Sequence, residues 1–212
     1  MYMKKIAMTM VVLTVSATSA GFISAAPATA ATAVAAAPAY ACTPAPTKQK
    51  SLRSVAAPKA KILTAAQTSL IQSQARALSK PTTWRGVALV HPTKSRFPKS
   101  VKRWANMVSA IMAEQGIPQK YLVGILAQLQ QESWGDPNAI YLADSNCRRG
   151  TPSMGLMQVI APTYLSYAKP GLRSVKYQML PYANVWAALK YAKSRYGMSK
   201  FAKWNKGQNQ GY

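Results

Sequence analysis

Residues 122–133 read LVGILAQLQQES, and this stretch decides how the rest of the chain is interpreted. Its large aliphatic side chains recur at intervals of three and four, the spacing that places side chains on one face of a helix; they are Leu122, Ile125, Leu126 and Leu129. Glu132 continues this face after Leu129. The stretch therefore predicts a helix that turns a carboxyl group towards the interior of the domain.

A carboxyl group at the end of a buried helical face is withdrawn from water. Because desolvation disfavours the charged form, we expect the pKa of Glu132 to be raised. A raised pKa keeps a carboxyl group protonated near neutral pH, as a general acid must be to protonate a glycosidic leaving oxygen. Periodicity alone fits equally well a glutamate that caps the helix or pairs with an arginine.

The surrounding segments predict a mainly α-helical domain over residues 101–212. Helices are expected at 101–115, from Pro118 through Glu132, in a short segment opened by Pro162, and at 181–196. Gly116 and Gly197 are natural terminators of two of them. Residues 134–153 are rich in Gly, Pro, Asn and Asp and predict a loop.

The first hundred residues predict export rather than catalysis. Residues 1–30 resemble a signal peptide, because two lysines precede about ten apolar residues, fewer than the roughly 20 that span a bilayer, and small residues follow. Residues 31–61 predict an Ala/Pro/Lys-rich linker, and 62–100 a helix to Ser79 followed by an extended basic lead-in. We expect a secreted protein that meets the membrane only through its signal, with an uncleaved anchor as the alternative.

The charge balance predicts a polyanionic partner. The chain has 27 Lys and Arg residues against 4 acids, and these four, Glu114, Glu132, Asp136 and Asp144, lie in one stretch. Nucleic acid, anionic lipid and cell wall are all polyanionic. The export signal and the lack of a nucleic-acid fold signature argue against nucleic acid.

Too few ligand-type residues are present for a zinc site or a histidine-based catalytic group. His91 is the only histidine, and zinc normally draws several His, Cys or acidic ligands. We therefore expect no metal and no cofactor. Cys42 and Cys147 allow at most one disulfide, and the sequence leaves open whether they pair.

Several segments, in order, resemble the soluble lytic transglycosylase family of the lysozyme-like superfamily. They are Gln131-Glu132-Ser133, then GLMQV at 155–159, then Ala183-Asn184-Val185 with Tyr191 in the turns that follow. Small actinobacterial and phage cell-wall domains share DSN at 144–146 and GTPS at 150–153. The resemblance covers about residues 102–196.

The resemblance implies that Glu132 is the catalytic acid and base and that residues 155–158 form a wall of the cleft. Asn184 and Tyr191 would be polar groups that the last helix turns towards Glu132 and the sugar. The expected substrate-binding set is Ser133, Ser153, Met157, Gln158, Asn184 and Tyr191. Met157 fits a plain core position as well. The family's later Tyr-Asn pair followed by Gly has only a weak counterpart at 203–207.

A single acid points to one of the known glycosidase routes. Asp136 and Asp144 each precede turn-forming residues and are expected to shape loops, so substrate-assisted chemistry with one carboxyl group is favoured. The resemblance then implies cleavage of peptidoglycan with formation of 1,6-anhydro ends, by a monomer that also contacts anionic wall polymers. A lysozyme-type hydrolase and a wall-binding protein without turnover are the alternatives.

Overall fold

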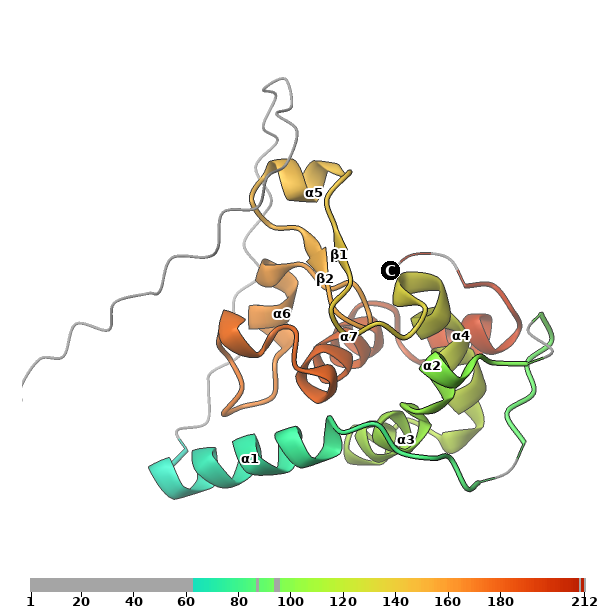
Figure 1. Cartoon of the computed structure of the whole chain (residues 1–212), viewed down its shortest axis with the longest axis horizontal. Helices are drawn as coiled ribbons and strands as arrows, with labels where there is room; N and C mark the ends of the chain where they lie inside the picture. The colour runs from blue at the N-terminus through green and yellow to red at the C-terminus, as the bar shows by residue number, and fades with distance from the viewer. Residues whose placement is uncertain (1–62, 87, 94–95, 210, 212) are drawn as a thin grey trace, which may run out of the picture. The chain divides into compact units, whose positions relative to one another are not determined.

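The computed structural model describes residues 63–86, 88–93, 96–209 and 211. The predicted signal (1–30), the predicted linker (31–61) and Cys42 lie outside these residues. The described residues all belong to one unit, residues 37–212, and they are mainly helical, as predicted (Figure 1). Among them, no helix is both long and apolar enough to cross a membrane.

Most elements are helices, and one short β-hairpin lies among them in the chain order. The helices are α1 (Ala65–Leu78), α2 (Lys99–Lys102), α3 (Ala105–Glu114), α4 (Leu122–Ser133), α5 (Ser145–Arg148), α6 (Ala161–Tyr167), α7 (Pro181–Tyr196) and α8 (Met198–Asn205). The 3-10 turns are η1 (Gln119–Tyr121) and η2 (Val175–Tyr177), and the strands are β1 (Ile140–Tyr141) and β2 (Ser153–Met154).

Helix α1 forms where the sequence predicts it and is tied to the domain by polar contacts. Thr64 and Gln67 form a capping box in which each side chain accepts the other's backbone N–H. At the far end, the Ser79 hydroxyl accepts the Tyr182 N–H at 3.1 Å. The Gln72 amide donates to the Gly171 carbonyl at 3.1 Å. Helix α1 therefore packs beside the start of α7.

The predicted helix at 101–115 is two helices, α2 and α3, that break at Arg103 and Trp104. The break lets both side chains reach one acceptor, the Gly135 carbonyl. The Trp104 indole N–H donates to it at 2.9 Å and Arg103 Nη2 at 3.0 Å. The Trp104 ring is buried in the hydrophobic core. A long-range contact thus interrupts a pattern that is helical by periodicity alone.

Helix α4 lies at the centre of the core, with its aliphatic face buried as predicted. It packs along α3 and along α8, a helix that the sequence analysis does not predict. Only two large apolar side chains of α8, Phe201 and Trp204, are fully buried. Two such residues in one short segment are too few to define a helical period.

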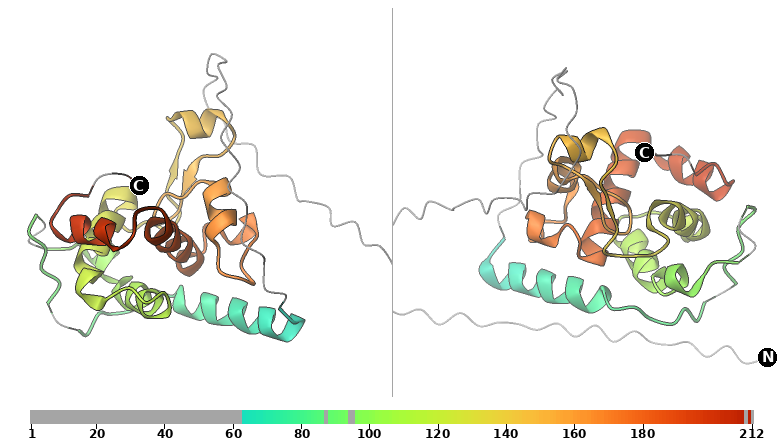
Figure 2. Two further views of the ribbon diagram at one scale, coloured as in Figure 1. Left: turned by 180° about the vertical axis from the view of Figure 1, so that it is seen from behind. Right: turned by 45° about the horizontal axis from the view of Figure 1, so that its top comes forward.

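The predicted loop at 134–153 contains a small hairpin and a helical turn. Strands β1 and β2 pair antiparallel, with Ile140 opposite Met154 and Tyr141 opposite Ser153. Helix α5 lies between the strands in sequence, and Figures 1 and 2 show both strands and α5 extending from the helical body. Two-residue strands are too short to show alternation in a sequence.

The single histidine has a structural place. His91 is buried, its Nε2 donates to the Trp204 carbonyl at 2.8 Å, and its Nδ1 accepts the Thr93 N–H at 3.3 Å. The ring thereby holds the lead-in before α2 against α8. Within the described ranges, no cluster of three or more His, Cys, Asp or Glu residues could hold a metal ion.

We predict that Gly124→Ala destabilises the domain, although alanine normally favours a helix interior by about 1 kcal/mol over glycine. A Cβ at Gly124 would lie 2.4 Å from the Asn205 backbone nitrogen. Since that neighbour is backbone, α8 must shift, at a cost of about 1–3 kcal/mol. Urea unfolding measures the change.

Gly211→Ala is the control, because a Cβ there meets nothing within 4 Å and the backbone φ is not positive, so we expect no loss of stability. Unfolding of Gly124→Ala at the same or a higher urea concentration than the parent protein would contradict the close packing of α4 on α8.

Candidate active site

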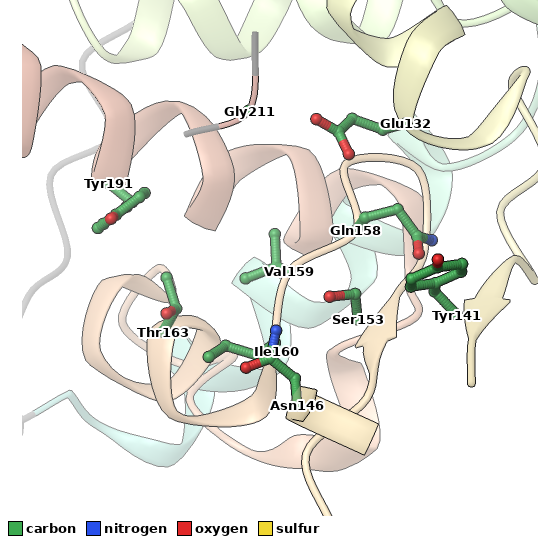
Figure 3. A pocket seen from close by; sticks show the side chains of 10 residues that line it. All are labelled: Glu132, Tyr141, Asn146, Ser153, Gln158, Val159, Ile160, Thr163, Tyr191 and Gly211. Carbon is green, nitrogen blue, oxygen red and sulfur yellow. The ribbon is translucent and has the colours of Figure 1, made fainter. Parts of the chain in front are cut away.

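A cavity of about 450 Å³ opens beside the end of α4 (Figure 3). It is lined by Glu132, Tyr141, Asn146, Ser153, Gln158, Val159, Ile160, Thr163, Tyr191 and Gly211. Figure 3 shows Glu132 and Tyr191 entering it from opposite sides, with Gln158 and Ser153 along the strand-loop wall. Helices α4 and α7 and the segment around β2 therefore meet at one polar opening.

Glu132 reaches this cavity because the buried face of α4 carries it there. Its side chain is half-buried, and burial raises the pKa of the carboxyl group from its ordinary value of 4.5. A hydrogen bond from Gln128 and the positive charge of Lys200 lower the pKa against that effect. The net shift is upward, so the carboxyl group holds its proton to higher pH than an exposed glutamate.

Gln128 is a contact of Glu132 that the sequence reading missed. It lies one turn earlier on α4, is fully buried, and donates from Nε2 to Glu132 Oε1 at 2.5 Å. Its own Oε1 accepts from Asn209 Nδ2 at 3.3 Å. The signal was present, since an amide one turn before Glu132 on a buried helix needs a polar partner.

Asn184 builds the cavity wall from behind instead of lining it. The side chain is fully buried; its Oδ1 accepts the Met157 N–H at 2.8 Å, and its Nδ2 donates to the Met154 and Gln178 carbonyls at 2.8 Å each. Gly155 leaves room for this amide, because a Cβ there would lie 2.5 Å from Asn184 Nδ2. The sequence predicts that Asn184 and Tyr191 both point towards Glu132 and the sugar. In the structure only Tyr191 lines the cavity, whereas Asn184 is buried and holds the wall from behind.

Gln158 is presented to the cavity by an unusual backbone conformation. Its φ of 47° is left-handed, which a residue with a side chain rarely adopts. Nε2 donates to the Ala139 carbonyl at 3.1 Å and the Gly155 carbonyl at 2.9 Å. The amide joins the loop before β1 to the loop after β2, and the side chain lines the opening as the sequence reading expected.

Two other expected site residues lie behind the wall. Met157 is fully buried in the core, the alternative placement considered for it above. Ser133 is buried and its hydroxyl donates to the Leu156 carbonyl at 2.8 Å. It thereby ties the end of α4 to the loop that Asn184 holds. Ser153 and Tyr191 do line the cavity.

Tyr191 belongs to an aromatic group at the side of the cavity facing Glu132. Its ring meets Tyr167 edge-on at 5.2 Å and Tyr196 at 6.0 Å between centroids. Burial, with the neighbouring tyrosine hydroxyl of Tyr196, raises the pKa of Tyr191 to about 12. The phenol is therefore a neutral hydrogen-bonding group at physiological pH.

The remaining acids do not line the opening, and each has its own partners. Asp136 Oδ1 accepts the Asn138 N–H at 2.9 Å in an Asx turn, as predicted. Asp144 caps α5 by accepting the Cys147 N–H at 2.9 Å. Glu114 pairs with Lys169 and accepts from the Tyr182 hydroxyl. Among the residues that line the cavity, Glu132 is the one acid.

Helix α5 brings Asn146 to the cavity and carries a disulfide-bonded cysteine. Cys147 is buried and is not a free thiol. Cys42, the other cysteine of the chain, lies outside the described residues. Tyr141, Val159, Ile160 and Thr163 also line the opening. The sequence reading did not select these four, because each becomes a neighbour of Glu132 only through the fold.

Comparison with known proteins identifies a family that the helical part of the chain matches. Residues 106–207 match the family model described as the transglycosylase SLT domain. The uncharacterized protein YqbO of Bacillus subtilis (strain 168) is 43% identical over 98 residues, which cover 46% of this chain and 6% of the relative. The chain thus corresponds to a small part of that protein's length. No solved structure gives a significant match.

We predict that Asn184→Leu destabilises the domain by roughly 3 kcal/mol, because the change leaves the Met157 N–H and the Gln178 carbonyl without this partner and removes one of the two hydrogen bonds to the Met154 carbonyl. Chemical denaturation measures the loss. Asn138→Leu is the control, since Asn138 is exposed. Equal stabilities for the two variants would mean that Asn184 does not hold the wall.

Proposed function

Residues 106–207 form a transglycosylase SLT domain of the lysozyme-like superfamily, and from this premise we propose that the protein is a lytic transglycosylase that cuts the glycan strands of peptidoglycan. The observation that carries the proposal is Glu132, a half-buried carboxyl group with a raised pKa in a cavity that no other acid lines. Its setting matches the need for a protonated acid at a glycosidic oxygen.

The first step is protonation of the leaving oxygen by Glu132. The bond between the anomeric carbon of N-acetylmuramic acid and that oxygen breaks, and the oxygen leaves as the hydroxyl of N-acetylglucosamine. With no second carboxylate at the cavity, the N-acetyl group of the same sugar supports the cationic centre. Glu132 is left as a carboxylate, which Gln128 and Lys200 stabilise.

The second step returns the proton to Glu132. The carboxylate takes the proton of the sugar's own C6 hydroxyl, and that oxygen bonds to the anomeric carbon. The product carries a 1,6-anhydro ring, and no water is consumed. Partial burial suits this step, because a carboxylate desolvated beside its substrate is a stronger base than one in water.

The cavity walls fit a sugar polymer. Amides, hydroxyls and two tyrosine rings line the opening, and such groups bond sugar hydroxyls and stack on sugar faces. The large excess of positive charge suits a wall that carries anionic polymers. Export by the segment 1–30, action outside the cell and action as a monomer are parts of the same proposal.

We predict that Glu132→Gln lowers the rate of peptidoglycan cleavage by about 10²- to 10⁴-fold, because glutamine keeps the shape of the side chain and has no proton to transfer. Asp136→Asn is the control, and we expect it to keep most of the activity. Release of soluble muropeptides from purified wall measures both. If the Glu132→Gln variant released muropeptides as fast as the parent protein, Glu132 would not be the catalytic acid, and the proposed mechanism would be wrong.

Mass spectrometry of the released fragments separates the two enzymatic outcomes. A transglycosylase gives 1,6-anhydro ends, whereas a hydrolase on the same fold adds water and gives reducing ends. Reducing ends alone, with activity lost in Asp136→Asn, would identify a hydrolase that uses two carboxyl groups.

We predict that Gln128→Leu moves the alkaline limb of the pH–rate profile to higher pH. The Gln128 hydrogen bond favours the charged form of Glu132, so its removal raises the pKa further. Because the rate falls as the acid loses its proton, the fall then begins at higher pH. Gln130→Leu is the control, since Gln130 is buried on another side of the same helix. An unshifted limb in Gln128→Leu would refute the role.

A further inference from the structure

A second cavity, of about 610 Å³, adjoins the end of α4 and α8. It is lined by Thr93, Gln131, Lys200, Lys203, Gly207, Gln208 and Asn209. It shares no lining residue with the first cavity, but Gln131 directly precedes Glu132 in α4. The second cavity therefore begins at the residue next to the proposed catalytic acid.

The chemistry of this lining suits an anion. Two of the residues are lysines, none is an acid, and the others offer amides, a hydroxyl and glycine backbone. Lys200 and Lys203 are three residues apart on α8, which places them on one side of the helix. Like charges at that spacing repel each other. An anion between the two ammonium groups would remove that repulsion.

Lys200 is already ordered for such a contact. Its Nζ donates to the Gly211 carbonyl at 2.9 Å. The same nitrogen lies 5.1 Å from the centre of the Tyr196 ring and 5.7 Å from that of Trp204. A side chain held in place loses less conformational entropy on binding than a free lysine does.

Two contacts connect this cavity to the catalytic carboxyl group. The charge of Lys200 acts on Glu132 and lowers its pKa. Asn209 donates to Gln128, which in turn donates to Glu132. An anion beside Lys200 would offset that positive charge. Occupation of the second cavity would thereby favour the protonated form of Glu132 that the first step needs.

We propose that the second cavity binds an anionic group, a carboxylate or a phosphate, of the same wall polymer that the first cavity cuts. The polymer's identity rests on the proposed function; the binding of an anion does not. A carboxylate would come from a peptide stem on the sugar, and a phosphate from a polymer linked to the wall. Lys203 and Lys200 are the residues that contact it.

The test measures binding to the full chain and does not depend on cleavage. The probes are a single disaccharide with a peptide stem that bears free carboxylates, the same compound with amidated carboxylates, and a glycerol phosphate oligomer. Lys203→Gln is the variant, because Lys203 is exposed and its loss leaves the core intact. Lys206→Gln is the matched control, since Lys206 is an exposed lysine next to α8 that does not line the cavity.

We expect Lys203→Gln to weaken binding of one charged probe by roughly 5-fold, the effect of losing one partly exposed ion pair. Lys206→Gln should change it less than about 2-fold. Loss confined to the carboxylate probe, and absent with the amidated one, identifies the peptide stem as the source. Loss confined to the glycerol phosphate oligomer identifies a phosphate polymer.

Equal effects of the two substitutions, or no effect of either, would overturn the proposal, because binding would then depend on general charge alone. Calorimetry supplies the affinities, and thermal unfolding verifies that both variants are folded. If the protein binds a charged probe through Lys203 but cuts no wall, the anion site stands and the proposed function fails. If the protein cuts wall but binds neither charged probe through Lys203, the proposed function stands and the anion site fails.

Discussion

Burial of one face of α4 is the constraint on which the other features depend. The aliphatic residues of that face are held by α3 on one side and by α8 on the other. Gly124 lets α8 approach so closely that backbone meets backbone. Because the helix cannot rotate without exposing this face, the side chain at its last turn has a fixed direction. Glu132 is carried to the edge of the core, where burial raises its pKa.

The opposite wall of the cavity depends on buried polar contacts. Segment 154–157 belongs to no long strand or helix that could satisfy its backbone groups. The Asn184 amide makes two hydrogen bonds to this segment and a third to the Gln178 carbonyl. Ser133 joins the same segment to the end of α4. The end of α4 that carries the carboxyl group is therefore joined to the facing wall by a direct hydrogen bond, which explains how a domain with little sheet maintains a defined opening.

Positive charge acts at two scales in this molecule. Over the whole chain, the excess of lysine and arginine favours contact with anionic surroundings. At the site, one of these charges, Lys200, is close enough to lower the pKa of Glu132 against the effect of burial. These opposing effects suit the proposed role of Glu132, because burial favours the protonated form that gives up the proton, whereas Gln128 and Lys200 stabilise the carboxylate that recovers it.

The sequence by itself determined the helical class and the positions of α4 and α7, and it directed the Glu132 carboxyl group to the edge of the core, because periodic burial and a polar residue at the end of an apolar face are local patterns. The role of Glu132 as the acid rests on the family resemblance and belongs to the proposed function. Only the tertiary structure decided that α2 and α3 separate at Trp104, that residues 198–205 form a helix, that Gln128 contacts Glu132, and that Asn184 and Met157 stand behind the cavity wall. Each of these features depends on a partner distant in sequence or on side-chain direction. Spacing along a chain describes which residues share a face, whereas the packing of other elements decides what that face meets.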